Sequence, residues 1–384
     1  MSTSVISRFK RVLMDLADKA VALLPEWTDE QSAKLAMRDA IPAFTATLPV
    51  NMATIPASHA DRFREPISFS PKYLYTLRNV YVSYLGVVFR NGRIFQPSLV
   101  RPDNPAHVYS SLEGRQKSAF LARQWGAQVR HPLADTQLPL VLAYESWSAQ
   151  NYYHWFCDAL PRLLLLRQHY STCTLLLPHA LPAFARESLA YLGFCNLHFI
   201  GKQDVVKVNE LIFPEPVASG GLHDPELIQQ VRDALLQHAT PLATPHKPKR
   251  LYVSRARAHK RKPCNEAQVV ALLHQYDFAV VYLEDHSFAE QVELLRDSEI
   301  LVGMHGAGLT NLLFLPTGSH VIEFMNAESM NLCYYHLASA IGVQYSCLLC
   351  SPIVQTGLDP NHSDILVDLV QLKETITGVL QKHN

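Results

Sequence analysis

The stretch "EILVGMHGAGLTNLLFLP", residues 299–316, carries the pattern on which the fold prediction rests. A first apolar run is typical of a buried strand and a second of a buried helix. The loop between them holds His305, Gly306, Ala307 and Gly308. Glycine lets a backbone approach a ligand closely, and the free N–H groups at a helix start attract phosphate. The stretch therefore predicts a strand–loop–helix unit with a phosphate site in its loop; the alternative is a tight turn with a structural histidine.

The same alternation runs through the second half of the chain. Strand-like runs are "RLYVSR", "FAVVYLE", "EILVGM" and "HVIEFM", and helix-like runs between them include "NEAQVVALLHQY" and "SFAEQVELLRDS". Strands that are apolar throughout and separated by helices predict a parallel sheet covered on both faces. We therefore expect an α/β fold, in which ligands bind beyond the carboxyl ends of the strands.

The first half gives a more varied pattern. In "NVYVSYLGVVFRNGRIF" apolar and polar residues alternate, and Asn91-Gly92 predicts a hairpin turn. Residues 153–170 have helical periodicity, with a kink or boundary expected near Pro161. Short apolar runs at 138–146 and 173–178 predict buried strands.

Bulk composition limits the function classes. The 384 residues predict two domains. A formal net charge of zero argues against nucleic acid as a partner, because phosphate backbones select strongly basic surfaces. The seven cysteines are odd in number and show no disulfide framework, so we expect reduced thiols in a cytosolic protein.

The N-terminal segment predicts an amphipathic helix. Apolar residues recur at helical spacing within residues 1–24, and charged residues interrupt any long apolar core. Such a helix could lie on a membrane surface, or its apolar face could pack on the protein or on a partner. Residues 25–75 give a weak, proline-rich pattern, and residues 240–250 resemble a linker.

Two polar clusters suggest chemistry. In "YVSRARAHKRKPCNE" the guanidinium groups of Arg255, Arg257 and Arg261 could bind a pyrophosphate bidentately; the alternative is a solvated basic loop. Glu323 ends an apolar strand, and its carboxylate could accept both hydroxyls of a ribose. Here a surface glutamate is the alternative. Together these residues describe a nucleoside-diphosphate site.

The second cluster lies in "SAQNYYHWFCDALPRL". If this segment is helical, His154, Asp158 and Arg162 share one face. A carboxylate on an apolar helix is costly unless it is used or paired. Asp158 is the first candidate for a general base and His154 the second, with Glu145 behind them. The alternative is an internal ion pair that holds the helix.

The order of these motifs resembles glycosyltransferase family 61. The similarity rests on "NYYHWFCDALPRL", "RLYVSRARAHKRKPCNEAQVVALL" and "SFAEQVELLRDSEILVGMHGAGLTNLLFLPTGSHVIEF" and spans about residues 140–330. The family includes bacterial capsule and surface-polysaccharide enzymes, plant xylan glycosyltransferases and an animal O-linked N-acetylglucosamine transferase. The resemblance implies a GT-B architecture, in which two Rossmann-like domains face a central cleft, and an inverting transfer with no metal and no cofactor other than the nucleotide sugar.

The resemblance also assigns site residues. The implied donor residues are Arg255, His305, Gly306, Ala307, Gly308 and Glu323, and we expect Arg261 and Asn311 to bind the donor with them. The implied acceptor-side pair is His154 and Asp158, which we expect to be catalytic. We expect Asn151, Trp155, Arg162 and Glu145 to lie on the acceptor side with them. The predicted domains are an N-terminal extension over 1–75, an acceptor-side domain over 76–240, a linker over 241–250, a nucleotide-sugar domain over 251–350 and a C-terminal segment over 351–384.

These patterns predict transfer of a sugar from a nucleoside-diphosphate sugar, with a UDP-sugar expected, to a glycan or glycolipid acceptor. We expect a cytoplasmic bacterial enzyme of surface-polysaccharide synthesis, with peripheral contact to the inner membrane or to assembly proteins through the N-terminal helix. The alternatives are a nucleotide-sugar epimerase or hydrolase on the same fold, and a non-catalytic subunit of a polysaccharide-assembly complex.

Overall fold

The computed structural model describes residues 26–28, 33–99, 128–130, 137–202, 204–217, 221–238, 247–353 and 360–383. The predicted helix over 1–24 and most of the predicted linker lie outside these residues. The chain divides into two compact units, the first formed by Met1–Ala40 and Ser70–Gly220 and the second by Ile41–Phe69 and Gly221–Asn384. None of the described helices combines the length and the apolar character that a membrane span needs.

The bounds of these units differ from the predicted domain boundaries. Helix α7 (Pro225–His238) was expected in the acceptor-side domain, but it belongs to the second unit. There the Nη2 group of Arg232 on α7 donates a hydrogen bond to the carbonyl of Leu315. Residues 41–69, expected within a separate extension, also belong to the second unit. Hydrophobic patterning predicts elements, and these boundaries depend instead on contacts between distant segments.

The second unit contains the predicted parallel sheet. Its six strands follow the order β14 (Ala279–Val281), β13 (Arg250–Val253), β15 (Ile300–Met304), β16 (His320–Asn326), β17 (Gln344–Ile353) and β18 (Asp364–Leu366). The first five strands are parallel, and β18 is antiparallel to β17. The chain crosses from β13 outward to β14 and then back past β13 to β15. The carboxyl ends of β13 and β15 therefore form a topological switch point, where α/β sheets bind ligands.

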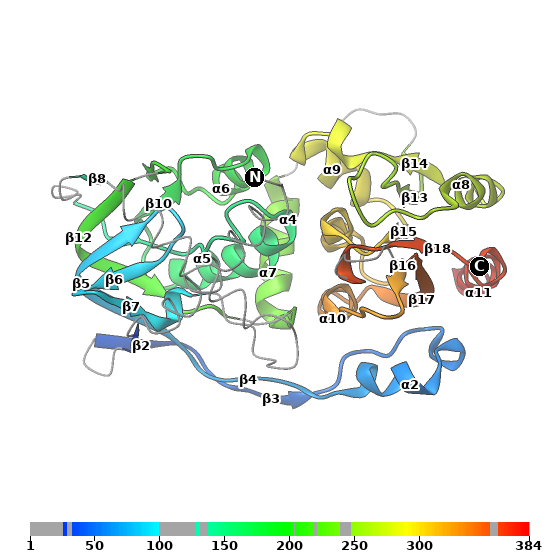
Figure 1. Cartoon of the computed structure of the whole chain (residues 1–384), viewed down its shortest axis with the longest axis horizontal. Coiled ribbons are helices and arrows are strands. Elements are labelled where there is room, and N and C mark those ends of the chain that lie inside the picture. The colour runs from blue at the N-terminus through cyan, green and yellow to red at the C-terminus, as the bar shows by residue number, and fades with distance from the viewer. Residues whose placement is uncertain are drawn as a thin grey trace, which may run out of the picture. The chain divides into compact units, whose positions relative to one another are not determined.

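Helices cover both faces of this sheet, which explains the uninterrupted apolar strands. Helices α8 (Glu266–His274) and α11 (Leu369–His383) pack on one face through Val269, Leu273, Leu372 and Ile376. Helices α9 (Phe288–Leu295) and α10 (Cys333–Ala340), with α7, lie on the other side of the strands (Figure 1). The polar side chain of Glu323 lies within β16, where both its neighbours along the strand are fully buried.

The segment after the "HGAG" loop is a 3₁₀-helix, η6 (Ala307–Phe314), where an α-helix was expected. The N–H of Leu309 donates to the carbonyl of Gly306, which is the i to i−3 bond of this tighter helix. The side chain of Asn311 donates a further bond to the carbonyl of Gly308. The tight turn keeps the apolar residues of η6 buried directly against the sheet.

Residues 25–75, which gave a weak pattern, contain several short elements. These are β1 (Glu26–Trp27), β2 (Ala33–Arg38), β3 (Ile41–Phe44), η1 (Met52–Thr54), α2 (Ala57–Ala60), η2 (Asp61–Arg64) and β4 (Ile67–Phe69). The part over 41–69 packs on the second unit. The Asn51 side chain bonds both the N–H and the carbonyl of Cys347 on β17. Phe63 meets Tyr335 edge-on at 5.0 Å between ring centroids.

The first unit is built on a mixed sheet of ten strands. The main path runs β1, β7 (Arg93–Phe95), β6 (Val88–Arg90), β5 (Lys72–Ser83), β12 (Asp204–Pro214), β9 (Leu140–Val141), β10 (Thr174–Pro178) and β11 (Leu197–Ile200), with β2 pairing β5 and β8 (Gln128–Arg130) pairing β12. The segment from β12 to β11 is parallel. The long pair of β5 and β12 is antiparallel. A simple Rossmann-like sheet was expected here, so the antiparallel half is a difference from the prediction.

Local signals in the first unit are confirmed where turn chemistry is specific. Strands β6 and β7 form the predicted hairpin, and its two turn residues have positive φ, 51° at Asn91 and 71° at Gly92. The helix over 152–167 is interrupted as expected near Pro161. A π-helical turn, η4 (Trp155–Ala159), separates α4 (Tyr152–His154) from α5 (Leu160–Arg167). Proline has no N–H for the carbonyl four residues earlier, so the helix widens just before it.

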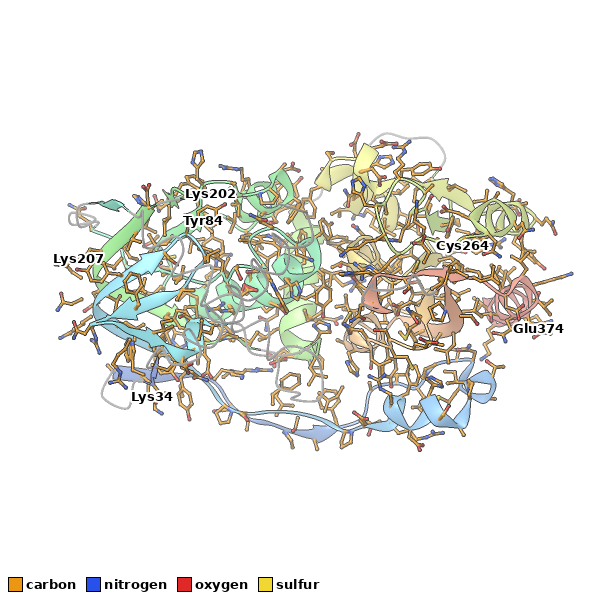
Figure 2. All side chains as sticks on the ribbon, viewed as in Figure 1. Lys34, Tyr84, Lys202, Lys207, Cys264 and Glu374 are labelled. Carbon is orange, nitrogen blue, oxygen red and sulfur yellow. The ribbon has the colours of Figure 1, made fainter. Side chains whose placement is uncertain are left out.

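All seven cysteines are free thiols, as predicted from their number and spacing. Cys347 and Cys350, the pair with C-x-x-C spacing, are buried on β17. Cys264 is exposed just before α8, where it is labelled in Figure 2.

Candidate active site

Arg255 follows the carboxyl end of β13 and is held by backbone carbonyls. Its Nε donates to the carbonyl of Arg261 at 2.7 Å, and its Nη2 donates to that of Lys260 at 3.1 Å. Within the described residues, no carboxylate makes an ion pair with Arg255. Burial, and then the charge of Arg261, lower the pKa of Arg255. Two arginine charges close enough to repel, with no ion-pairing carboxylate on Arg255 among the described residues, form a place that attracts an anion.

The two glycines of the "HGAG" loop have different roles. A Cβ atom added to Gly306 would collide with Nη1 of Arg255. Glycine at this position therefore lets the guanidinium lie directly on the loop that follows β15. A Cβ atom added to Gly308 would instead press on the side chains of Leu283 and Val253, at 3.3 and 3.4 Å. Gly308 thus lies in close packing with the side chains of Leu283 and Val253, whereas Gly306 lies against the guanidinium of Arg255, which follows β13.

His305 is oriented by Glu323. The Nδ1 atom of His305 lies 2.5 Å from Oε1 of Glu323, whose side chain is 0% exposed. The other carboxylate oxygen of Glu323 accepts a hydrogen bond from the Tyr345 hydroxyl at 2.6 Å. Glu323 was expected to bind a ribose, but both its oxygens are engaged by protein groups and none of it reaches the surface. Its observed role is to hold the imidazole of His305.

Glu266, which the motif analysis missed, organises the basic loop. Its Oε1 atom accepts hydrogen bonds from the Tyr252 hydroxyl, the Ser254 hydroxyl and the backbone N–H of Arg255, at 2.9, 2.7 and 3.2 Å. Glu266 opens α8 directly after the basic loop. A carboxylate in the first turn of that helix was a visible signal, because anions are favoured at helix N-termini.

The remaining predicted donor residues lie in different environments. Asn311 is 1% exposed, and its amide joins η6 to Gln291 on α9 at 3.1 Å, so it supports the loop from beneath. The Nε atom of Arg261 is buried and has no hydrogen-bond partner in the structure. Arg257 forms an ion pair with Asp285 at 2.6 Å and lies over the Tyr282 ring, so its charge is already neutralised.

His154 and Asp158 in the first unit form a close pair. The Nδ1 atom of His154 lies 2.6 Å from Oδ2 of Asp158, and the two side chains are 23% and 30% exposed. Asn151 caps the start of this helix, because its Oδ1 accepts from the N–H of Tyr153 at 2.9 Å. Burial lowers the pKa of His154, but the hydrogen bond to Asp158 and the charges of Asp158 and Glu145 outweigh it, so the pKa is raised overall.

Glu145 completes this cluster. Its carboxylate accepts from the N–H of Ser148 at 2.9 Å and from the Ser148 hydroxyl at 2.6 Å, which closes the turn after β9. Burial and the charge of Asp158 raise the pKa of Glu145. Ligand atoms of Glu145, His154 and Asp158 all lie within 4.8 Å of one another, so the three could surround a divalent cation. A cation would have to displace the short bond between His154 and Asp158.

Trp155 and Arg162, expected on the acceptor side, are part of the core. Trp155 is 0% exposed, and its indole N–H donates to the Ser188 hydroxyl at 2.8 Å, which fixes the helix to α6 (Ala183–Tyr191). Arg162 is 2% exposed and donates from Nε and Nη2 to the carbonyl of Pro214 at the end of β12. Neither side chain offers a surface to an acceptor; both hold in place the helix that carries His154 and Asp158.

Most residues of the two clusters fall within the range that matches one known protein family. Residues 152–322 match the family model of glycosyltransferase 61. The matched range begins one residue after Asn151, contains His154, Asp158, Arg255, His305 and Gly306, and ends one residue before Glu323. This match to the family model supports the resemblance that the order of the motifs indicated.

Segments of the chain are also similar to curated animal proteins. Over 112 residues the chain is 41% identical to the EGF domain-specific O-linked N-acetylglucosamine transferase of Drosophila melanogaster, covering 27% of this chain and 21% of the relative. The protein of the same name from Gallus gallus is 39% identical over 90 residues, 22% and 17% of the two chains. The protein of this name from Xenopus laevis is 50% identical over 58 residues, which cover 15% of this chain and 11% of the relative.

The chain thus spans about a fifth of the length of the curated relatives it matches. Both comparisons support a glycosyltransferase. The animal relatives do not fit the expectation of a bacterial enzyme, and nothing in the matches supports a role in capsule synthesis.

Proposed function

We propose that the protein is a glycosyltransferase that moves a sugar from a nucleoside-diphosphate sugar to a hydroxyl acceptor with inversion at the anomeric carbon. The observation that carries the proposal is the pair Arg255 and Arg261 at the switch point of the parallel sheet. Their charges repel, and among the described residues no carboxylate forms an ion pair with Arg255 and no hydrogen-bond partner meets the buried Nε of Arg261. A diphosphate would satisfy all three features at once.

The donor diphosphate would lie against the Arg255 guanidinium, the imidazole of His305 and the start of η6. The N–H groups of Ala307 and Gly308 precede the first bonded N–H of that helix, that of Leu309. Such groups favour a negative charge at a helix start. As the sugar leaves, charge builds on the diphosphate, and donors already in position stabilise it. A UDP-sugar remains our first proposal for the donor.

The acceptor hydroxyl must lose a proton as it attacks the anomeric carbon. We assign this step to the pair of His154 and Asp158. Asp158 binds Nδ1 of the imidazole, so the remaining nitrogen, Nε2, is the basic atom available to an acceptor. The raised pKa of His154 makes it a stronger base than an isolated histidine. On the sequence alone, Asp158 is the first candidate for the general base. In the present assignment Asp158 instead orients the imidazole of His154.

The transfer is proposed to need no metal. Arg255, Arg261 and η6 supply the positive charge that a cation would otherwise bring to the leaving diphosphate. The cluster of Glu145, His154 and Asp158 is the place where a cation would bind if this proposal were wrong.

The acceptor class is proposed from the family resemblance and from the names of the animal relatives. A glycan or glycolipid is our first proposal for the acceptor, and a protein with an EGF domain, which the animal relatives are named for, is the second. The GT-B arrangement and a cytoplasmic location are likewise proposals. They draw on the family resemblance.

The proposal is tested by product analysis with a panel of UDP-, GDP-, CMP- and dTDP-sugars, each with and without acceptors. A glycosylated acceptor and released nucleotide are expected for one donor. The second candidate is an epimerase or hydrolase, because the donor-binding half of such an enzyme would look the same. Conversion of the sugar nucleotide without an acceptor would support this second candidate. His154→Ala should lower the transfer rate by about 10²- to 10⁴-fold while donor binding persists.

A further inference from the structure

A buried tyrosine on β17 is linked to the proposed phosphate site through two hydrogen bonds. The Tyr345 hydroxyl donates to Oε2 of Glu323 at 2.6 Å, and Oε1 of the same carboxylate lies 2.5 Å from Nδ1 of His305. Exposure is 2% for Tyr345, 0% for Glu323 and 17% for the His305 side chain. The chain of contacts therefore begins in the core and ends at the loop that follows β15.

The three residues meet because of the sheet register. β16 and β17 are parallel neighbours, with Glu323 opposite Cys347 and Val321 opposite Tyr345. Side chains two apart along a strand point to the same face, so Tyr345 and Glu323 share the face that η6 and α10 cover. The loop after β15 brings His305 over the end of β16, where its N–H bonds the carbonyl of Phe324.

A carboxylate buried without exposure is costly unless its oxygens are satisfied. Here the hydroxyl of Tyr345 satisfies one oxygen and the imidazole of His305 the other. Burial and the charge of Glu323 raise the pKa of Tyr345 well above its ordinary value, so the phenol stays protonated and can only donate to the carboxylate. With Tyr345 as donor on one side, the carboxylate is left to accept from Nδ1–H of His305 on the other.

We infer that Tyr345 is a positioning residue for phosphate recognition: through Glu323 it fixes His305 with Nδ1–H directed into the core and Nε2–H directed at the diphosphate of the donor. The inference rests on the proposed donor site and deepens it. Tyr345 itself touches no substrate. The edge of the Tyr334 ring, 5.0 Å from the His305 ring between centroids, limits the imidazole from the α10 side. His305 then presents one charge-assisted donor at a fixed place.

The test compares two variants, each of which lacks the hydroxyl group of one buried tyrosine. Tyr345→Phe removes the hydroxyl that binds Glu323, and Tyr335→Phe removes a buried hydroxyl that binds the carbonyls of Ala46 and Phe63. The two ring centroids are 5.5 Å apart in the same unit, so any loss of stability that is not specific to the phosphate site should be similar in the two variants. Affinities for UDP and for uridine are measured by calorimetry, because only UDP carries the diphosphate. The same titrations are run on His305→Ala.

For Tyr345→Phe we expect UDP affinity to fall about tenfold or more, the value of one charge-assisted hydrogen bond, while uridine affinity stays within about twofold. Tyr335→Phe should leave both affinities near wild type. Should Tyr345→Phe not fold, Glu323→Gln replaces it, since it keeps the shape and removes the charge that holds His305. The same selective loss is expected there.

Selective loss of UDP affinity in His305→Ala, with wild-type affinity in Tyr345→Phe or in its Glu323→Gln replacement, would overturn the inference and leave the donor site standing. An equal loss of UDP and uridine affinity in the same variant would overturn it too, because a merely structural role predicts that pattern. A wild-type protein that binds no nucleoside diphosphate would overturn the proposed function together with the inference.

Discussion

Gly306 lies against the guanidinium of Arg255 so closely that any side chain at Gly306 would overlap Nη1 of the arginine. The two residues follow neighbouring strands, β15 and β13, whose carboxyl ends form the switch point of the sheet. Their contact joins the basic loop to the "HGAG" loop and creates the positive face of the proposed donor site.

Gly306→Ala is therefore expected to displace Arg255 and to weaken binding of a nucleoside diphosphate, on the order of the 1.5–3 kcal/mol of one lost charged hydrogen bond. The matched control is Gly378→Ala. Gly378 lies in α11, and a Cβ atom there meets nothing within 4 Å. Alanine at that position should raise the free energy of unfolding by about 0.5–1 kcal/mol and leave binding unchanged. Equal nucleotide affinity in both variants would contradict the role of Gly306.

The pH dependence of transfer should report His154. As a base it must be neutral, so the rate should rise with pH through a pKa above the ordinary value of histidine. Asp158→Asn removes the charge and weakens the hydrogen bond that raise the pKa of His154, and it leaves the burial that lowers this pKa. The acidic limb of the rate profile should then move to lower pH, with a smaller maximal rate. An acidic limb that stays in place in Asp158→Asn would rule out the pair as the base.

The same pair should make stability depend on pH. The pKa of His154 is higher in the folded protein than in the unfolded chain. Its contribution to the free energy of unfolding is therefore complete below about pH 6.5 and is lost as pH rises through the folded pKa. Urea unfolding near pH 6 and near pH 9 should show a larger loss of stability for His154→Ala at the lower pH. Because both side chains are partly exposed, the difference should be small, below about 1 kcal/mol. A larger loss at the higher pH would contradict the direction of the shift.

Glu266 is expected to matter for both stability and binding. Glu266→Ala leaves the hydroxyl of Tyr252, a residue that is 0% exposed, without its acceptor and should lower the free energy of unfolding by about 1–3 kcal/mol. It should also weaken diphosphate binding, because the N–H of Arg255 loses its anchor. Glu266→Gln keeps an acceptor oxygen in place, so its effects should be milder. An alanine variant as stable as the glutamine variant would show that these bonds add little.

Chelation tests the metal-free proposal. Transfer should continue in EDTA, since Arg255, Arg261 and the start of η6 supply the charge that the leaving diphosphate needs. Full loss in EDTA, with recovery on adding Mn²⁺ or Mg²⁺, would contradict this. Glu145→Gln would then locate the cation, because Glu145 belongs to a cluster of described residues whose ligand atoms all lie within 4.8 Å of one another.

The sequence predicted the second sheet well because its strands are buried on both faces and read as continuous apolar runs. It also predicted the hairpin at Asn91 and Gly92, where only certain residues accept positive φ. The π-helical turn before Pro161 was anticipated only as a kink. The antiparallel pair of β5 and β12 was not anticipated, since pairing between segments so far apart in the chain leaves no local signal.

Among the site residues, too, local sequence patterns decided which relationships could be predicted. His154 with Asp158 could be paired from helical spacing, and Arg255 with His305 could be brought together from their positions after parallel strands. The roles of Glu323, Asn311, Trp155 and Arg162 could not, because burial decides whether a polar group meets a ligand or the protein. Tyr345 was missed because an aromatic residue in an apolar strand looks like core until its hydroxyl partner is known.

The most direct measurement is calorimetric titration of UDP, or of the best diphosphate in a nucleotide panel, into wild type, Arg255→Ala and Arg257→Ala. The two arginines lie two residues apart in one loop, but in the described part of the chain only Arg257 forms an ion pair with a carboxylate, that of Asp285. We predict that Arg255→Ala lowers affinity by about 10- to 150-fold and that Arg257→Ala stays within about twofold of wild type. Equal affinities in all three proteins, or a loss of the same size in both variants, would contradict a diphosphate site built on Arg255.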